Sequence, residues 1–419
     1  MRVIADFLAG VFKRAPARFI FLTLLIALYV TNALPILREW GHIRTFGQPH
    51  THIRLAQEFL QGSMEFDELF YKDIAIFQGH YFSPFPPFPA LALMLPVALF
   101  GVNWPITLIT PLLGAGIGVI LYRVLVRMDV QPAVSAWCAY GFVLGTVHWF
   151  TLRSSIDTCL ANVLAVGLVF LAMEFAVHRR APLWIGVFMG CAFLSRQLAI
   201  LSLPFVWALM RDSDGDQRFR RMLRPLLWTV PGLALALGLY LLYNHLRFGN
   251  PMECGYPYIA EPSWYGTRME RWGIHHWIYI PSNLLQLFVQ GFVIEFNDPN
   301  RLIPDMGQSG TSLTFASPFL FFALAGRFSR RPLLNWTGGI GIGLCLMVLL
   351  MNKNAMGGWQ INGMRYALDF LPTLMIFAAR GMQRHADGPY HIVWKSAIVY
   401  SILLNALAFS IQYIPKMFG

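Results

Sequence analysis

Long apolar runs recur along the whole chain, and they constrain the fold more than any other feature of the sequence. The hydrocarbon core of a bilayer is roughly 30 Å thick, so a spanning helix needs about 20 apolar residues. Candidate runs lie at 18–37, 105–126, 133–151, 157–177, 226–245, 312–326, 333–352, 364–380 and 394–414. Only 13% of the residues are charged, whereas soluble proteins carry roughly 25%. We therefore predict an all-α polytopic membrane protein and exclude a soluble or disordered chain.

The stretch from Pro182 to Met210 is longer than one span and carries Arg196 in its middle. Basic residues flank it on both sides, which the positive-inside rule places on the cytoplasmic side. The stretch is therefore expected to form a hairpin of two short helices, with Arg196 at the turn inside the outer leaflet. Each arm would rise about 20 Å at 1.5 Å per residue. This gives about eleven spans, with the N-terminus inside and the C-terminus outside.

The net charge of +11 is explained by the same rule, because lysine and arginine gather in the short segments that this topology places inside. Nucleic-acid binding is therefore not predicted. The first apolar run is followed by Arg38 and Glu39 instead of a small-residue cleavage site, so it reads as a retained helix. We expect a transmembrane module at 1–245 that includes the outer loop 38–104, a second outer loop at 246–311 and a C-terminal transmembrane module at 312–419.

Both long outer loops contain patterns that favour ordered structure. Residues 50–62 place apolar side chains on one helical face and end at Gly62, which is typical of an amphipathic helix with a glycine stop. Alternating prolines and phenylalanines at 82–89 then lead into the apolar run 90–100, which is too short to span a bilayer. We expect that run to form a helix lying at the outer interface.

Charged side chains at the outer boundary are the candidates for chemistry. Arginine at membrane depth is costly and marks a functional hypothesis. Arg196 and Arg365 both fall at this boundary, and their forked donors match the oxygens of a lipid phosphate. The alternatives are snorkelling of the side chain toward water or, for Arg365, an ion pair with Asp369 at i,i+4 on one helix. Acidic residues such as Asp73 and Glu253 crowd the outer loops, where carboxylates can accept hydrogen bonds from a hydroxyl-rich substrate or act as general bases.

Histidines do not point to a metal site. His50 and His52 form a lone HxH pair, and His275 and His276 form a lone HH pair, without further ligands at a known spacing. No cofactor is predicted. Interfacial histidines are the simpler explanation for both pairs.

The order of motifs resembles the GT-C superfamily of integral membrane glycosyltransferases, which includes protein O-mannosyltransferases and bacterial aminoarabinose transferases. The segment Gly79-His80-Tyr81-Phe82-Ser83-Pro84-Phe85-Pro86-Pro87, closed by Phe100-Gly101, is similar to that family's first outer loop. The segments Leu194-Ser195-Arg196-Gln197, Tyr243-Asn244-His245-Leu246-Arg247-Phe248-Gly249-Asn250-Pro251 with Gly255-Tyr256, and Gly363-Met364-Arg365-Tyr366 with Asp369 resemble later ones. The resemblance spans nearly the whole chain, and the order of the motifs is more specific than any one of them.

The resemblance implies a hexosyl- or pentosyltransferase that moves a sugar from a polyprenyl-phosphate donor to an acceptor hydroxyl with inversion. The acceptor would be a glycan, a glycolipid or a protein, and the enzyme would lie in a bacterial inner membrane with its site facing the periplasm. Arg196 and Arg365 would then bind the donor phosphate. The residues expected to bind the substrate lie in the motifs and loops; they are His80, Tyr81, Gln197, Glu253 and Tyr256.

One departure concerns the catalytic base. Many members carry an Asp-Glu pair shortly after the first helix, and this chain has Gln48-Pro49 there. Asp73, shortly before the Gly79-His80-Tyr81 motif, is the replacement candidate, and Glu39 at the exit of the first helix is the second.

Two other classes of function stay open. A lipid-linked sugar flippase or secondary transporter would need inverted repeats and a midplane site, and the sequence shows no repeat. A non-catalytic assembly subunit is the third reading, because the expected Asp-Glu pair is missing.

Overall fold

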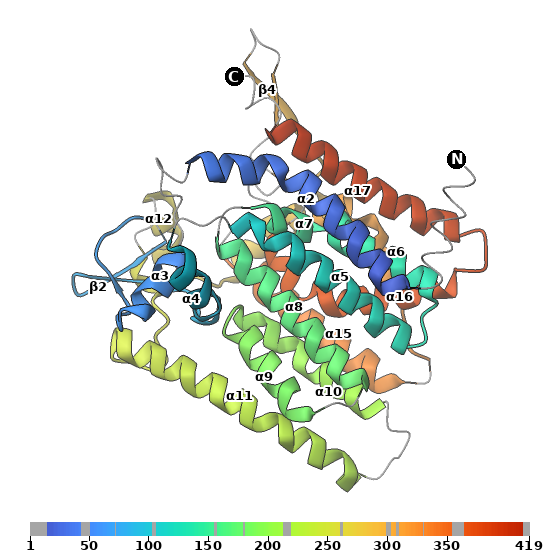
Figure 1. The fold of residues 1–419 in the computed structure, drawn as a ribbon, viewed down its shortest axis with the longest axis horizontal. Coiled ribbons are helices and arrows are strands. Elements are labelled where there is room, and N and C mark those ends of the chain that lie inside the picture. The colour runs from blue at the N-terminus through green and yellow to red at the C-terminus, as the bar shows by residue number, and fades with distance from the viewer. Residues whose placement is uncertain are drawn as a thin grey trace.

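The structure is a computed structural model, and it forms a bundle of helices with a compact outer part at one end (Figure 1). It describes residues 15–42, 51–71, 73–102, 106–154, 157–178, 181–212, 219–259, 263–298, 303–306, 310–329, 331–353 and 364–413. Within these ranges, six helices are long and apolar enough to cross a membrane. They are α2 Pro16–His42, α5 Thr110–Arg127, α8 Asp157–His178, α11 Phe219–Phe248, α15 Pro332–Leu350 and α17 His391–Tyr413. The protein is a polytopic, essentially all-α membrane protein.

Shorter apolar helices fill the rest of the bundle. They include α6 Pro132–Gly145, α9 Pro182–Phe193, α10 Leu203–Asp212 and α16 Leu371–Arg384. Helix α5 packs against α2, α6 and α8, helices α9 and α10 pack against α8, and α16 and α17 close the bundle against α6. Their buried apolar side chains form one continuous core.

Three of the expected spans are not single α-helices. The run 133–151 breaks at Thr146, whose side chain accepts a hydrogen bond from the His148 amide at 3.2 Å and so caps the separate helix α7, Val147–Arg153. The run 312–326 forms α14, Leu313–Ala316, and the 3₁₀ segment η6, Pro318–Ala325. Pro318 lacks the amide hydrogen that would continue α14.

The third is the run 364–380, which begins as the 3₁₀ segment η7, Arg365–Asp369, before α16. Segment η6 and α16 approach each other so closely that a Cβ at Gly326 or Gly381 would collide with the opposite backbone. Close backbone contact of this kind needs glycine at both positions.

The stretch 182–212 is the hairpin that the sequence predicts. On α9, a Cβ at Gly186 would collide with the Thr229 carbonyl of α11, and on α10 the Trp207 indole donates to the Thr229 hydroxyl at 3.2 Å. Between them, Gln197 donates to the Tyr240 hydroxyl at 3.1 Å, about 16 Å further along α11 at 1.5 Å per residue. The chain therefore climbs beside α11, turns near Gln197 and returns to the same level.

The first outer loop folds as a small unit on the ends of α8 and α11. It contains α3 Thr51–Leu60, the strands β1 Glu65–Phe66, β2 Ala75–Phe77 and β3 His80–Phe82, and α4 Phe88–Phe100. Helices α3 and α4 confirm the two helices expected in this loop. The strands were not expected; they form an antiparallel sheet in the order β1-β3-β2. A second, smaller core lies beneath this unit and includes Ile53, Leu93 and Tyr243.

The second outer loop is mostly short helical turns. It contains η3 Tyr256–Tyr258, α12 Ser263–Trp272, η4 Trp277–Tyr279, α13 Ile280–Leu284 and the π-helical η5 Leu285–Val289. The antiparallel strands β4 Ile294–Asp298 and β5 Ile303–Met306 form a hairpin that projects from the bundle beside the end of α17 (Figure 1). We call the end of the molecule that carries the two outer loops the loop end.

Polar contacts connect the helices at the end of the bundle opposite to the loop end. We call this the basic end. Arg331 lies 3.8 Å from the Asp129 carboxylate, and the backbone amide of Gln131 donates to the side-chain oxygen of Gln383 at 2.7 Å. Arg384 donates to the Ser329 hydroxyl at 3.1 Å. Segments that the expected topology places on one side of the membrane thus lie together.

Candidate functional site

The two arginines singled out in the sequence lie at the loop end, on different elements. Arg196 occupies the turn between α9 and η2, Gln197–Ser202, and Arg365 begins η7. Arg196 makes a bidentate ion pair with Asp369: Nε donates to Oδ1 at 3.1 Å and Nη2 to Oδ2 at 2.7 Å. The Asp369 side chain is only 2% exposed and that of Arg196 is 22% exposed. The pair thus fixes the hairpin turn to η7 inside the protein.

Asp369 therefore pairs with Arg196 and not with Arg365, the i,i+4 partner considered from the sequence. The reason is local backbone geometry. Residues 365–369 form a 3₁₀ turn, in which residues four apart point about 120° away from each other. The side chain of Asp369 is thereby turned away from Arg365 and toward the hairpin.

The Tyr366 ring brings the two arginines together. The Arg196 guanidinium carbon lies 4.6 Å from the ring centroid and that of Arg365 lies 5.4 Å from it. The face of an aromatic ring attracts cations, so Tyr366 offsets part of the repulsion between the two charges. Arg365 also approaches the sulfur of Cys159 at the start of α8, at 3.9 Å. Both guanidinium groups thus belong to one cluster, which we call the arginine site.

Two more residues predicted for substrate binding join the arginine site. Gln197 directly follows Arg196 and contacts Tyr240 of α11, as described above. Tyr256 of η3 is partly buried. Its desolvation raises the pKa of its phenol, Tyr366 raises that pKa further, and Arg196 lowers it. Tyr256 consequently stays protonated at neutral pH and can donate a hydrogen bond beside the arginines.

A glycine turn brings Tyr256 to this position. Gly255 has a φ of 88°, and a Cβ there would collide with the Phe248 ring, so only glycine fits. Its amide donates to the Glu253 carboxylate at 2.8 Å. Glu253 was predicted to bind substrate. In the described part of the structure, its carboxylate accepts this hydrogen bond from the turn.

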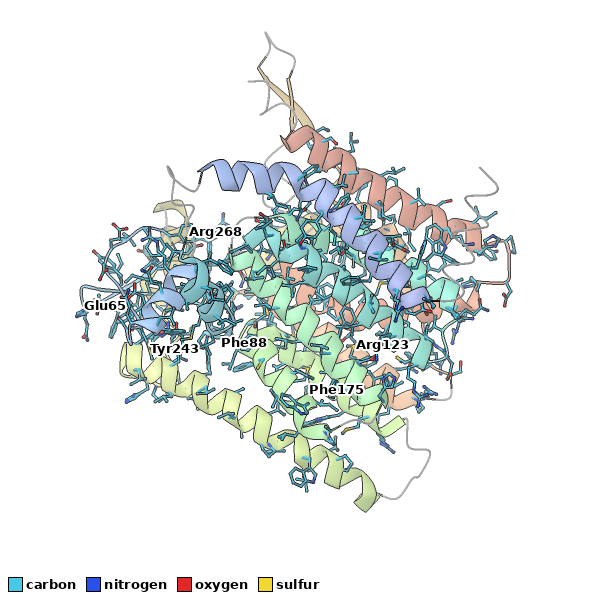
Figure 2. All side chains as sticks on the ribbon, viewed as in Figure 1. Glu65, Phe88, Arg123, Phe175, Tyr243 and Arg268 are labelled. Atoms are coloured by element: carbon cyan, nitrogen blue, oxygen red, sulfur yellow. The ribbon has the colours of Figure 1, made fainter. Side chains whose placement is uncertain are left out.

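The first outer loop covers the arginine site from the side of α4. The Phe88 amide donates to the Leu194 carbonyl at 3.1 Å, at the hairpin turn next to Arg196. Arg247 near the end of α11 donates to the Ser83 carbonyl and, at 2.7 Å, to the Asn244 side chain. Figure 2 shows Phe88 between the outer loop and the bundle, with Tyr243 of α11 to its left. The loop is thus attached both to the hairpin and to α11.

The candidate bases lie in or near this cover. Asp73 is half-buried and precedes Ala75, which forms a β-bridge with Ile259 just after η3. No contact among the described residues joins Asp73 to Arg196 or Arg365. Glu39 lies on the last part of α2, and its side chain falls outside the described part of the structure, as do Gln48 and Pro49.

The remaining predicted residues belong to the outer sheet. His80 of β3 is exposed, and its Nδ1 lies 2.6 Å from the Glu65 carboxylate of β1. Tyr81 faces the small core under the loop. Neither contacts the arginine site within the described residues. Nor do those residues contain a group of three or more His, Cys, Asp or Glu side chains that could hold a metal ion.

The arginine site contains two guanidinium groups and one carboxylate. Asp369 balances one of the two arginines, which leaves a net charge of +1 for the three groups. Its carboxylate occupies Nε and Nη2 of Arg196, so the Nη1 edge of the fork can serve another acceptor. Tyr240 and Tyr366 could not be singled out from the sequence, because a tyrosine near the end of an apolar run also fits an interfacial aromatic belt.

No protein-family model matches the sequence, and no curated protein matches it either. The structure is similar to the crystal structure of the Archaeoglobus fulgidus oligosaccharyltransferase in the apo form, with a TM-score of 0.49 and 13% identity over 95% of this chain. It is also similar to the archaeal oligosaccharyltransferase AglB of that organism in complex with an inhibitory peptide and a dolichol-phosphate, with a TM-score of 0.43 and 13% identity over 96% of this chain. The chain spans about half the length of these proteins, 55% in each case.

Proposed function

We propose that the chain is a glycosyltransferase that moves a sugar from a polyprenyl-phosphate donor to an acceptor hydroxyl at the outer face of the membrane. The observation that carries this proposal is the arginine site, where Arg196 and Arg365 share the Tyr366 ring and Asp369 balances one of their charges. The order of GT-C-like motifs supports it, because three of those motifs contribute residues to this one site.

The arginines would act on the leaving group. When the glycosidic bond to the donor phosphate breaks, the bridging oxygen gains negative charge. Preorganised cationic donors aimed at this charge lower the barrier, because they need no reorientation during the reaction. The ion pair to Asp369 and the stacking on Tyr366 would supply that preorganisation for Arg196.

A carboxylate would activate the acceptor. A sugar hydroxyl has a pKa far above 7, so its proton must leave as the oxygen attacks the anomeric carbon. Asp73 is the first candidate, since it lies in the outer loop that covers the arginine site, and Glu39 is the second. The acceptor is a glycan, glycolipid or protein hydroxyl, and no metal ion is assigned to the reaction.

The topology that goes with this function has about eleven passes, both outer loops in the periplasm and the basic end in the cytoplasm of a bacterial inner membrane. The hairpin at 182–212 and the gathering of basic segments at one end support it. Reporter fusions in the 213–218 segment and at the C-terminus would test it. The two reporters are expected on opposite sides, and finding them on the same side would contradict the topology.

The direct test is sugar transfer by the purified protein in lipid nanodiscs, supplied with labelled polyprenyl-phosphate sugars and crude envelope acceptors. Asp73→Asn is expected to abolish turnover while it keeps donor binding. Asp67→Asn, at an exposed acid of the same loop, is the matched control and should transfer normally. Turnover retained in Asp73→Asn would move the base to Glu39, and no transfer by the folded wild type from any such donor would overturn the function.

A further inference from the structure

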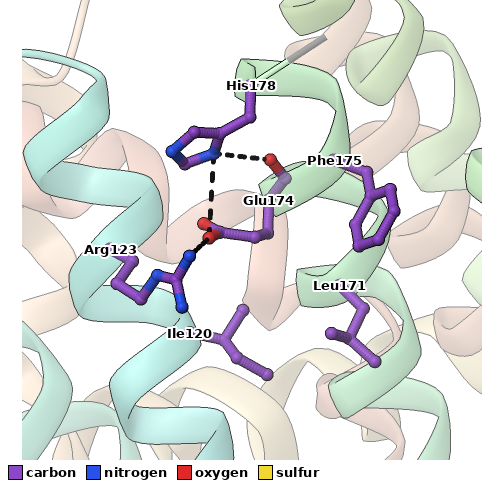
Figure 3. Close-up of a pocket in the computed structure, with 6 residues that line it drawn as sticks. All are labelled: Ile120, Arg123, Leu171, Glu174, Phe175 and His178. Carbon is purple, nitrogen blue, oxygen red and sulfur yellow. Dashed lines mark hydrogen bonds and ion pairs between the residues drawn. The ribbon is translucent and has the colours of Figure 1, made fainter. Parts of the chain in front are cut away.

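A second charged cluster lies at the basic end, on the opposite side of the bundle from the outer loops (Figure 2). It sits between the last turns of α5 and α8 and opens into a cavity of about 150 Å³. Figure 3 shows the cavity and the side chains that line it, which are Ile120, Arg123, Leu171, Glu174, Phe175 and His178. None of these residues takes part in the proposed transfer reaction.

The polar part of the cavity is held in a fixed arrangement. Arg123 Nη2 lies 2.6 Å from the Glu174 carboxylate, whose side chain is only 10% exposed. His178 Nδ1 lies 2.9 Å from the Glu174 carbonyl oxygen, one turn back on α8. Half of the Arg123 side chain is exposed, so Glu174 orients a guanidinium that still faces outward (Figure 3).

A larger and more polar cavity of about 310 Å³ adjoins this one. The two share Arg123 and His178, and the second is further lined by Tyr122, Val126, Arg127 and Asp129. Asp129 is paired with Arg331. Arg380 lies there too and donates to the Met128 carbonyl, next to Asp129, at 3.4 Å. These groups comprise four arginines and two carboxylates, so positive charge is in excess around the mouth.

The other side of the cluster is apolar and continues toward lipid. Ile120, Leu171 and Phe175 line the smaller cavity and are partly exposed. The Phe175 ring packs edge-on against Phe188 of α9. The half-exposed Trp184 stacks on the Phe188 ring. The groove is thus cationic at its mouth and apolar along its length.

We propose that this groove binds one anionic phospholipid from the leaflet at the basic end, with its phosphate at Arg127 and Arg123 and an acyl chain along Ile120, Leu171 and Phe175. Charge complementarity selects the ligand, because the excess of arginines around the mouth favours an anionic headgroup over a zwitterionic one. Basic pockets between transmembrane helices bind anionic headgroups in this way, and each arginine near such a headgroup contributes enough binding energy to change the affinity about fivefold.

Native mass spectrometry of the purified protein with added dioleoyl phosphatidylglycerol or dioleoyl phosphatidylcholine tests the proposal. One phosphatidylglycerol is expected to bind in preference to phosphatidylcholine, and Arg127→Gln should weaken that binding about fivefold. Arg127 is exposed, so this substitution leaves the fold intact. Arg211→Gln, at an exposed arginine of α10 at the same end, is the matched control and should bind as the wild type does.

Three outcomes would overturn the proposal. The first is equal binding of the two lipids, which would show that the headgroup charge is not recognised. The second is an equal effect of Arg127→Gln and Arg211→Gln, which would show general attraction by the basic end. The third is displacement of phosphatidylglycerol by millimolar inorganic phosphate, which would identify a soluble anion as the ligand.

Discussion

Two arginine–carboxylate pairs stand at opposite ends of this bundle, and their surroundings differ. At the loop end, the Arg196 and Asp369 side chains are 22% and 2% exposed and form two parallel hydrogen bonds. At the basic end, the Arg123 and Glu174 side chains are 50% and 10% exposed, and Arg123 lies 2.6 Å from one carboxylate oxygen. The first pair is enclosed by Tyr366 and the outer loops, whereas the second opens onto a groove.

The difference shows how burial changes what a guanidinium–carboxylate pair can do. An enclosed ion pair costs several kcal/mol of desolvation for each ion, and it is retained only where the geometry of its hydrogen bonds is good. Water is largely excluded around an enclosed pair, so the pair exerts a strong electrostatic effect on a reacting group. An open pair is weakened by solvent and is suited to orienting a surface residue. This difference supports both proposals, sugar transfer at the loop end and lipid binding at the basic end.

The largest expected effect is that of Asp369→Asn, which would leave Arg196 buried without its counter-ion. Breaking a buried pair in this way typically costs about 3–5 kcal/mol. Thermal unfolding in detergent should show a correspondingly large loss of stability. Asp387→Asn, at an exposed acid, is the control and should unfold with the wild type. Equal stability of the two variants would show that the pair at the loop end is not enclosed.

A double variant sharpens this test. Arg196→Met combined with Asp369→Leu removes both charges, and apolar replacement of a buried pair is often neutral or stabilising. The double variant is therefore expected to unfold close to the wild type while it fails to transfer sugar. Unfolding close to the wild type together with loss of transfer would separate the structural role of the pair from its role in the reaction.

The next effect is on rate. Arg365→Gln removes one of the two donors for the leaving phosphate, and loss of one such donor costs about 100-fold or more in kcat. Arg365→Lys keeps the charge but loses the fork, so an intermediate rate is expected. Arg271→Gln, at an exposed arginine of α12 in the outer part, should leave kcat unchanged. An unaltered kcat in Arg365→Gln would remove this residue from the site.

A smaller effect is expected at the turn that brings Tyr256 to the arginines. Gly255→Ala combines an unfavourable positive φ with a collision at Phe248, whereas Gly249→Ala has a positive φ of 69° and open space around the new methyl group. Strain at one such position costs about 1–3 kcal/mol. Gly255→Ala should therefore lower both stability and transfer more than Gly249→Ala, as measured by unfolding and initial rates. The same response from both variants would mean that the contact with Phe248 is unimportant.

The smallest effect is predicted at the basic end. Glu174→Gln breaks this ion pair and leaves Arg123, half of whose side chain is exposed, to be solvated by water, so the expected loss of stability is about 1 kcal/mol. Sugar transfer should be unchanged, because the cluster lies at the opposite end from the arginine site. A loss comparable to that of Asp369→Asn would show that the two pairs are alike and would break the comparison.

The sequence predicted those features that depend on local pattern. Apolar length and basic flanks predicted a hairpin at 182–210, and amphipathic spacing predicted a helix at 50–62; the structure has them at 182–212 and Thr51–Leu60. The cost of arginine at membrane depth singled out Arg196 and Arg365, which the structure brings to one tyrosine ring. Each of these signals is carried by a few neighbouring residues.

Features that depend on distant contacts could not be predicted in this way. Asp369 pairs with a residue 173 positions away because η7 is a 3₁₀ turn, and nothing in the local sequence distinguishes that turn from the first turn of a helix. The outer sheet is built from strands of two or three residues, which are too short for an alternating pattern. The contacts of His80 with Glu65 and of Glu253 with Gly255 likewise follow from loop folding.

The most direct test of the central claim compares sugar transfer by two folded proteins in nanodiscs, the wild type and the double variant Arg196→Met with Asp369→Leu. Both would receive the same labelled polyprenyl-phosphate sugars and envelope acceptors. We predict label on an acceptor with the wild type and none with the double variant. Equal transfer by both proteins, or no transfer by the wild type from any of these donors, would contradict the account.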